Sequence, residues 1–149
     1  MKKVLAVASI GGHWVQLLRI ASGLEATHEV AYMSTHAKCA TMVEGHRFYQ
    51  IKDFSRWDAY KVIPAFFSAM NTVRKVNPSI VITTGAAPGL IVLFAAFCLG
   101  KKTVWIDSIA NVNHLSLCGR IAKKFASRFY TQWEELATDG VYFAGNVIG

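Results

Sequence analysis

The chain has 149 residues, of which 53% are hydrophobic and 17% charged, so it can bury the core of one domain and is not a disordered protein. Its three scattered cysteines, and the lack of Cys or His pairs at metal-ligand spacing, exclude a disulfide framework and predict no metal site. The formal net charge of +7 leaves three classes of partner open: nucleic acid, an acidic membrane surface, or an anionic substrate.

The first predicted unit is a strand, a tight turn and a helix. The stretch from Lys3 to Ser9 is apolar between its two ends, a glycine pair follows at Gly11 and Gly12, and apolar positions return at helical spacing from Val15. The turn places His13 at the carboxyl end of a strand and the amino end of a helix, where open α/β sheets bind ligands. An imidazole there is a candidate general base, although a residue that merely caps the turn explains the same pattern.

Strands are predicted next at residues 28–33 and 47–51, followed by a helix over about residues 57–75. Pro64 fits this helix only if it begins near Tyr60, because proline is tolerated in a first turn. One face of the helix is apolar and aromatic: Trp57, Tyr60, Ile63, Phe67 and Met70. Such a face suits either the protein core or a membrane surface.

The uncharged stretch from residue 76 to residue 100 is long enough to cross a membrane, but Gly85, Pro88 and Gly89 interrupt it. We therefore expect a buried strand over residues 79–84 and a buried helix over residues 90–99. The loop between them lies on the same rim as His13. Its small residues either leave room for a ligand or simply allow close packing.

A strand over residues 102–107 is predicted to end in Asp107, which either binds sugar hydroxyls, orients His13 or caps a helix. A helix is predicted over residues 117–128. Its basic face, which is either solvated or in contact with anionic lipid, consists of Arg120, Lys123, Lys124 and Arg128. Short strands follow at residues 129–132 and 141–143.

This alternation of strands and helices predicts an α/β fold, namely a Rossmann-like, mostly parallel sheet with helices on both faces. No internal repeat or linker interrupts it, so residues 1–149 are expected to form a single domain.

Several motifs together resemble one family. They are Ser9-Ile10-Gly11-Gly12-His13, Thr84-Gly85 before a helix, Asp107-Ser108-Ile109-Ala110-Asn111, Leu115-Ser116-Leu117-Cys118-Gly119-Arg120 and Gln132-Trp133-Glu134-Glu135-Leu136. These segments resemble the bacterial PssD-like glycosyltransferase subunits of capsule and exopolysaccharide synthesis. That family is similar to the membrane-anchoring subunit of the eukaryotic transferase that adds the second GlcNAc to a dolichol-linked sugar, and MurG-type enzymes share the glycine-glycine-histidine turn.

The resemblance implies the amino-terminal, acceptor-binding half of a GT-B glycosyltransferase. A partner polypeptide would supply the carboxy-terminal half, which binds the UDP-sugar donor, so no cofactor is expected on this chain. The acceptor would be a saccharide on a polyprenyl diphosphate. The chain itself would be attached peripherally to the cytoplasmic face of the plasma membrane. The sequence is consistent with a half-enzyme, because no second α/β unit and no dinucleotide glycine fingerprint appear in it.

With this resemblance, His13 is the first candidate for the catalytic base and Asp107 the second. Acceptor binding is predicted for Gly11, Gly12, Gly85, Ser108 and Asn111. The surface toward the membrane or the partner subunit is predicted to contain Arg120, Lys123, Lys124, Arg128 and Trp133.

Two other functions are open on the sequence alone. The chain is either a non-catalytic membrane scaffold for the donor-binding subunit, or a self-contained nucleotide- or nucleic-acid-binding module. The second is disfavoured because no basic stripe with interleaved aromatic residues is present, so no nucleic-acid partner is predicted.

Overall fold

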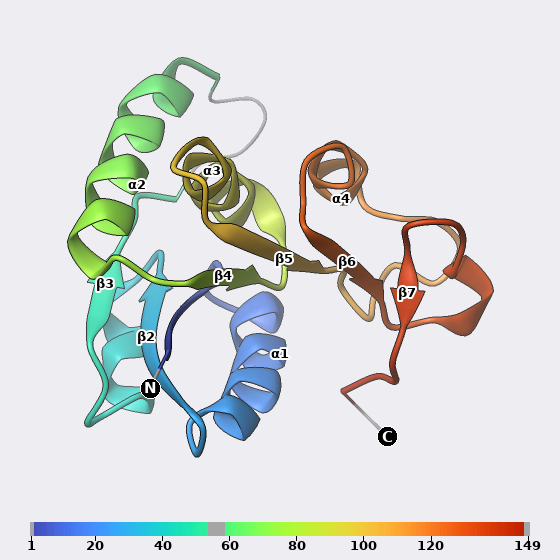
Figure 1. Ribbon diagram of the computed structural model, residues 1–149, viewed down its shortest axis with the longest axis horizontal. Coiled ribbons are helices and arrows are strands. Elements are labelled where there is room, and N and C mark those ends of the chain that lie inside the picture. Colours follow the sequence, from blue (N-terminus) through green and yellow to red (C-terminus); the bar gives the residue numbers. More distant parts are fainter. Residues whose placement is uncertain (1, 54–58, 148–149) are drawn as a thin grey trace.

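The computed structural model describes residues 2–53 and 59–147 as one sheet flanked by helices (Figure 1). The strands are β1 (Lys2–Val7), β2 (His28–Ser34), β3 (Phe48–Gln50), β4 (Ile80–Thr83), β5 (Lys102–Ile106), β6 (Arg128–Thr131) and β7 (Tyr142–Phe143). The α-helices are α1 (Gly12–Ala21), α2 (Val62–Val76), α3 (Ala86–Cys98) and α4 (Leu117–Ala122). Short 3₁₀ segments cover Ser22–Leu24, Ala37–Met42, Ala59–Lys61 and Glu134–Leu136.

The seven described strands are hydrogen-bonded in the order β3-β2-β1-β4-β5-β6-β7, and every pair of neighbours is parallel. This confirms the predicted Rossmann-like sheet. The strand order reverses between β1 and β4, because β2 lies on one side of β1 and β4 on the other. Such a reversal opens a crevice beyond the carboxyl ends of the two strands, where open α/β sheets hold their ligands.

Helices cover both faces of the sheet, with α1 on one face and α2, α3 and α4 on the other (Figure 1). Strand β1 explains how both cores form, since its side chains alternate between them. Leu5 and Val7 pack into the core beneath α2, α3 and α4, whereas Val4 and Ala6 pack beneath α1. Because both faces of the sheet are covered, the central strands appear in the sequence as continuous apolar runs.

Two prolines lie in the first turns of their helices. Pro64 is the third residue of α2, as the sequence requires, and Pro88 is the third residue of α3. A first-turn residue has no intrahelical partner for its N–H, so proline costs nothing there. Helix α3 therefore begins at Ala86, four residues earlier than predicted. No helix in the described part of the chain is long and apolar enough to cross a membrane.

Three residues of the apolar face predicted over residues 57–75 lie in solvent, whereas Met70 is partly buried against the core. Tyr60, Ile63 and Phe67 are 76%, 66% and 64% exposed. The buried face of α2 carries small and β-branched residues instead: Ala65, Ala69, Val73 and Val76. Of the two interpretations left open for the aromatic face, packing into the core is therefore wrong for these three residues. Trp57 lies outside the described residues.

The predicted helix over residues 117–128 is wrong in its length, because α4 ends at Ala122 and Arg128 begins β6. Reciprocal hydrogen bonds bring the chain into the sheet before β6. Ser127 N donates to Thr103 Oγ1 at 3.0 Å, and Thr103 N donates to Ser127 Oγ at 3.0 Å. The four predicted cations consequently do not share one helical face.

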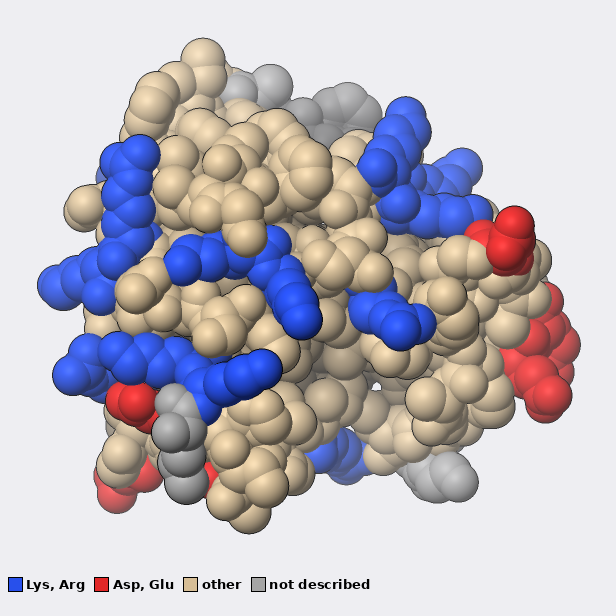
Figure 2. Space-filling view, viewed as in Figure 1, with Lys and Arg blue, Asp and Glu red and all other residues tan. Residues whose placement is uncertain are grey.

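The cations gather instead where strands begin and helices end. Because the strands are parallel, all their first residues lie at one edge of the sheet. The exposed cations at this edge, here called the amino-edge basic surface, are Lys2, Arg47, Arg74, Lys75, Lys102, Lys123, Lys124 and Arg128. Figure 2 shows Lys and Arg side chains spread across the face that carries the amino end of the chain, with acidic side chains at its margins.

Candidate functional site

The candidate site is the crevice between the loop that follows β1 and the loop that follows β4. These strands are neighbours at the point where the strand order reverses, and their loops lead to helices on opposite faces of the sheet. Gly11 precedes α1 and Gly85 precedes α3, with φ of 107° and 130°. Both angles are ones that side chains with a Cβ rarely adopt, so glycine is required at both turns.

His13 is fixed to the opposite loop by two hydrogen bonds. Its Nδ1 lies 3.0 Å from the carbonyl oxygen of Thr84, and Thr84 Oγ1 donates to the carbonyl oxygen of His13 at 2.6 Å. A carbonyl oxygen only accepts, so Nδ1 carries the proton and donates, and Nε2 is left with its lone pair. Within the described residues Nε2 has no protein partner, and the side chain is half-buried at the rim.

Gly85 leaves the space that His13 occupies. A Cβ at Gly85 would lie 2.9 Å from His13 Cε1 and 3.0 Å from His13 Nδ1, closer than real Cβ contacts. The backbone continues in an unusual conformation, because Ala86 has a φ of 68°. Positive φ at a residue other than glycine is costly, and such strain gathers at functional sites. The predicted grouping of Gly11, Gly12, His13 and Gly85 is present in the structure.

Asp107 has a different environment from that of His13. Its side chain is 1% exposed, and Oδ1 accepts from Trp105 Nε1 at 3.0 Å and from Ser116 Oγ at 2.6 Å. Its other oxygen, Oδ2, accepts from Ser116 N at 3.0 Å. Ser116 is the N-cap of α4, so the carboxylate anchors the start of that helix. These contacts are those of the capping interpretation, and a role of Asp107 toward substrate stays a prediction.

Gly119 explains part of the motif around α4. A Cβ there would lie 2.6 Å from Asp107 Oδ1 and 2.8 Å from Ser116 Oγ, so glycine lets α4 pack directly on the buried carboxylate. In the motif of residues 115–120, glycine is therefore explained by the packing of α4 against Asp107, behind the rim.

Two buried amides connect α1 to the rim: Gln16, which no sequence motif contained, and Gln132, the first residue of the last motif. Gln16 Nε2 donates to Ser108 Oγ at 3.1 Å, and Gln16 Oε1 accepts from Ile109 N at 3.1 Å. Gln132 Nε2 donates to Gln16 Oε1 at 2.7 Å and to the Asp107 carbonyl oxygen at 3.0 Å. Gln16 lies three residues after His13, on the same side of α1. The signal in the sequence that could have identified Gln16 is a polar side chain at a helical position where the apolar spacing predicts burial.

The remaining predicted residues make contacts with groups other than His13. Ser108 is buried beneath Gln16, whereas Asn111 is partly exposed and its N–H donates to the Ser108 carbonyl oxygen at 3.1 Å. Trp133 is partly buried, and its Nε1 donates to the Ile109 carbonyl oxygen at 2.7 Å, so it braces this loop. Arg120 is exposed on α4, and Arg128 lies over the Tyr142 ring at 4.9 Å.

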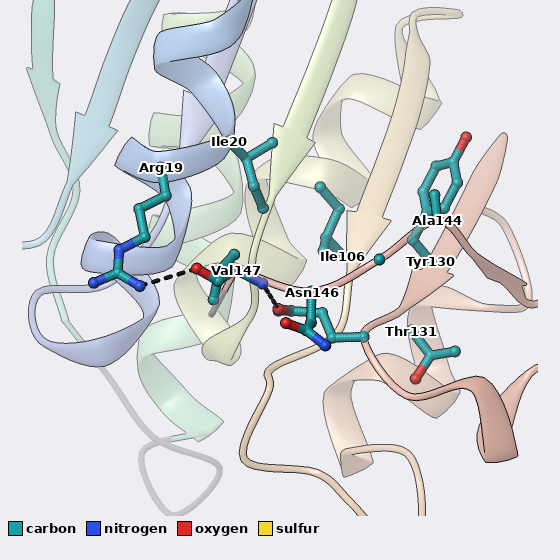
Figure 3. Close-up of a pocket in the computed structure, with 10 residues that line it drawn as sticks. Arg19, Ile20, Ile106, Tyr130, Thr131, Ala144, Asn146 and Val147 are labelled. Atoms are coloured by element: carbon teal, nitrogen blue, oxygen red, sulfur yellow. Dashed lines mark hydrogen bonds between the residues drawn. The ribbon is translucent and has the colours of Figure 1, made fainter. Parts of the chain in front are cut away.

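A cavity of about 450 Å³ lies on the α1 side of the sheet and includes none of the predicted site residues (Figure 3). It is bounded by α1, by the ends of β5 and β6 and by residues 144–147. Two hydrogen bonds hold this last segment: Arg19 Nη1 donates to the Val147 carbonyl oxygen and Val147 N donates to Gln132 Oε1, both at 3.0 Å. Gln132 thus links the cavity wall to the loops of the rim.

A family model described as "Oligosaccharide biosynthesis protein Alg14 like" matches residues 4–146. Curated proteins named "UDP-N-acetylglucosamine transferase subunit ALG14" are similar to part of the chain. The protein from Yarrowia lipolytica is 34% identical over 79 residues, which cover 49% of this chain and 37% of that protein. The protein from Schizosaccharomyces pombe is 40% identical over 87 residues, 50% of this chain and 40% of that protein. The matches therefore span less than half the length of these relatives.

Solved structures of the same fold include MurG from Acinetobacter baumannii. It has a TM-score of 0.83 at 18% sequence identity, and the match covers 98% of this chain and 46% of MurG. The UDP-GlcNAc 2-epimerase from Neisseria meningitidis bound to UDP-GlcNAc has a TM-score of 0.74 at 14% identity, over 98% and 47% of the two chains. These likenesses show the fold, which is that of one half of a GT-B protein.

Proposed function

Because the chain belongs to the Alg14-like family of oligosaccharide biosynthesis proteins, we propose that it is the acceptor-binding subunit of a two-chain glycosyltransferase. A partner subunit binds most of the UDP-sugar donor, and this chain presents the acceptor hydroxyl. The names of the curated relatives make UDP-N-acetylglucosamine the first donor to test. The proposed acceptor is a saccharide on a polyprenyl diphosphate, extended for capsule or exopolysaccharide.

The observation that carries this proposal is the position of His13 and the hydrogen bond that its Nδ1 makes. Its ring lies at the reversal of strand order, its Nδ1 donates to the Thr84 carbonyl oxygen, and its Nε2 lone pair has no protein partner within the described residues. This is the arrangement of an imidazole that is oriented through one nitrogen and accepts a proton at the other.

In the proposed reaction the acceptor oxygen attacks the anomeric carbon of the UDP-sugar while its proton moves to His13 Nε2. The bond between that carbon and the UDP oxygen breaks, and UDP leaves with the electron pair. A positioned base contributes roughly 10² to 10⁴ in rate. Gly11, Gly12 and Gly85 allow the acceptor to approach the backbone at the amino ends of α1 and α3. Ser108 and Asn111 belong to the loop proposed to contact the sugar.

Asp107 enters the proposal as a positioning residue. Its carboxylate is engaged by Trp105 and Ser116, and its carbonyl oxygen accepts from Gln132, which in turn donates to Gln16 on the helix of His13. This chain of contacts supports a role in fixing the rim.

We also propose peripheral attachment to the cytoplasmic face of the plasma membrane. Support comes from the amino-edge basic surface, which attracts anionic lipid head groups, and from the exposed side chains of Tyr60 and Phe67. Of the predicted contacts, Lys123, Lys124 and Arg128 belong to this surface, and Arg120 is exposed on α4.

The test is to purify the chain with its donor-binding partner and to measure transfer from UDP-N-acetylglucosamine to a polyprenyl-diphosphate saccharide. His13→Ala should lower kcat by roughly 10² to 10⁴ and leave partner binding intact. His28→Ala, at the start of β2, is the matched control and should keep normal turnover. Near-normal turnover in His13→Ala would reduce the chain to a scaffold that docks its partner.

A further inference from the structure

An apolar groove of about 620 Å³ crosses the outer surface of the helical layer, between α2, α3 and α4. Nine of its ten lining residues are apolar: Val62, Ile63, Phe66, Phe67, Leu90, Ile91, Phe94, Ile121 and Phe125. The tenth, Lys124, has an aliphatic stem that can lie along apolar surface while its ammonium group stays in water. A hollow with an apolar lining and a single charged residue at its margin suits an apolar ligand or partner.

The groove has a floor and walls, so it is not a flat patch. The floor is formed by partly buried side chains: Phe66, Leu90, Ile91 and Phe125. The walls are formed by exposed side chains: Ile63, Phe67, Phe94 and Ile121. Ring contacts tie the layers together, with Phe94 at 5.8 Å from Phe66 and 5.4 Å from Phe125 between centroids. Partly buried and exposed rings thus form an extended apolar hollow along which a hydrocarbon chain can lie.

Helix α3 connects the candidate site to the groove, because its first residue follows Gly85 and three of its later residues line the groove. That helix begins immediately after Gly85, beside His13, and Leu90 follows five residues later, about 8 Å along the helix axis. At the other end of the groove, Lys124 belongs to the amino-edge basic surface. The groove therefore lies along α3 between the rim that would hold the acceptor head and the surface proposed to meet anionic lipid.

We infer that this groove binds the polyprenyl chain of the lipid-linked acceptor, an inference that rests on the proposed function. An isoprenoid chain is an uncharged, branched hydrocarbon, and a lining without hydrogen-bonding side chains other than Lys124 suits it. The volume lies within the range of small-molecule sites, about 300–1,000 Å³. The saccharide and diphosphate remain at the rim, and the hydrocarbon runs along α3 away from His13.

The test compares two acceptors that have the same saccharide diphosphate, one with a long polyprenyl chain and one with a chain too short to reach Leu90. Transfer is measured in detergent solution with the complex of the chain and its donor-binding partner. Phe94→Ser removes a wall of the groove and should raise KM for the long-chain acceptor roughly tenfold, which corresponds to about 1.4 kcal/mol. The KM for the short-chain acceptor and kcat for both should stay unchanged.

Leu117→Ser is the matched control, because Leu117 is an exposed apolar residue at the start of α4, 45% exposed against 40% for Phe94, and does not line the groove. A second variant, Ile121→Trp, fills the groove without removing apolar surface. It should raise KM for the long-chain acceptor and leave binding to vesicles of anionic phospholipid intact.

The inference would be overturned, and the surface assigned to the bilayer, if Phe94→Ser and Leu117→Ser had equal effects and Ile121→Trp had no effect on KM. The inference would also be overturned if KM depended on the length of the acceptor's polyprenyl chain to the same extent in the wild type and in all variants. Failure of the proposed function looks different, because no acceptor of either length would then be glycosylated.

Discussion

The side chain of His13 is oriented by backbone atoms from another loop and not by a neighbouring acid. The Thr84 carbonyl oxygen accepts from Nδ1, and the Thr84 hydroxyl donates back to the His13 carbonyl oxygen. A backbone acceptor fixes the tautomer of an imidazole as a carboxylate would, but adds no negative charge. Gly85 completes the arrangement, since the imidazole occupies the space in which a Cβ would stand.

Gly85→Ala should therefore lower transferase activity by moving His13. We expect a loss of about tenfold to hundredfold in kcat, because a displacement near 1 Å is enough for that. Gly45→Ala is the control, since Gly45 also has a positive φ, 88°, but a Cβ there meets no atom within 4 Å. Both variants should lose about 1 kcal/mol of unfolding free energy or more, measured in urea. Equal activity in the two variants would contradict the positioning role of Gly85.

At the scale of elements, the position of α3 follows from the small residues at its start. Gly89 faces Thr83 of β4, and a Cβ at Gly89 would collide with Thr83 Oγ1. That hydroxyl also accepts from Gly85 N at 3.2 Å, so the strand end, the turn and the first turn of α3 form one tightly packed unit. The small residues of this loop thus serve close packing, one of the two interpretations that the sequence left open, and ligand access stays a prediction.

Gly89→Ala should destabilise the fold by about 1–3 kcal/mol, the usual cost of overpacking a tight core. The measurement is the midpoint of urea unfolding at unchanged m-value. Gly23→Ala serves as the control, because Gly23 has open space around it, and should change stability by no more than about 0.5 kcal/mol. An unchanged midpoint for Gly89→Ala would mean that α3 moves away from β4 without cost.

The whole molecule has two unlike edges. The carboxyl edge of the sheet carries the glycine turns and His13, and the amino edge carries the amino-edge basic surface. The outer face of α2, α3 and α4 adds exposed phenylalanines between them. Acidic side chains are absent from the centre of the face drawn in Figure 2.

The double variant Lys102→Glu with Lys123→Glu should weaken binding to vesicles that contain anionic phospholipid by roughly tenfold or more, since each surface cation contributes about 1 kcal/mol. Vesicle co-sedimentation at low and high salt measures this, and wild-type binding should fall with salt. Lys38→Glu is the control, because Lys38 follows the carboxyl end of β2 at the opposite edge. If all variants bind vesicles equally, the amino edge is not the membrane contact.

Local patterns in the sequence determined the fold class and the composition of the rim. Alternating strands and helices, with apolar runs broken by glycine, predicted a parallel sheet and placed Gly11, His13 and Gly85 at one edge. They did so because strand and helix periodicity are properties of neighbouring residues. The length of α4 was mispredicted because the apolar spacing continues past Ala122, while the Ser127–Thr103 bonds that end the helical course join residues 24 apart in the chain.

Only the tertiary structure decided what each side chain of the site touches. Whether Asp107 faces a substrate or anchors a helix depends on Trp105 and Ser116, and the tautomer of His13 depends on Thr84, 71 residues away. The same holds for the exposed face of α2, because either face of that helix is apolar enough to be buried. Sequence fixes local conformation, whereas burial and hydrogen-bond partners arise from segments that meet only after folding.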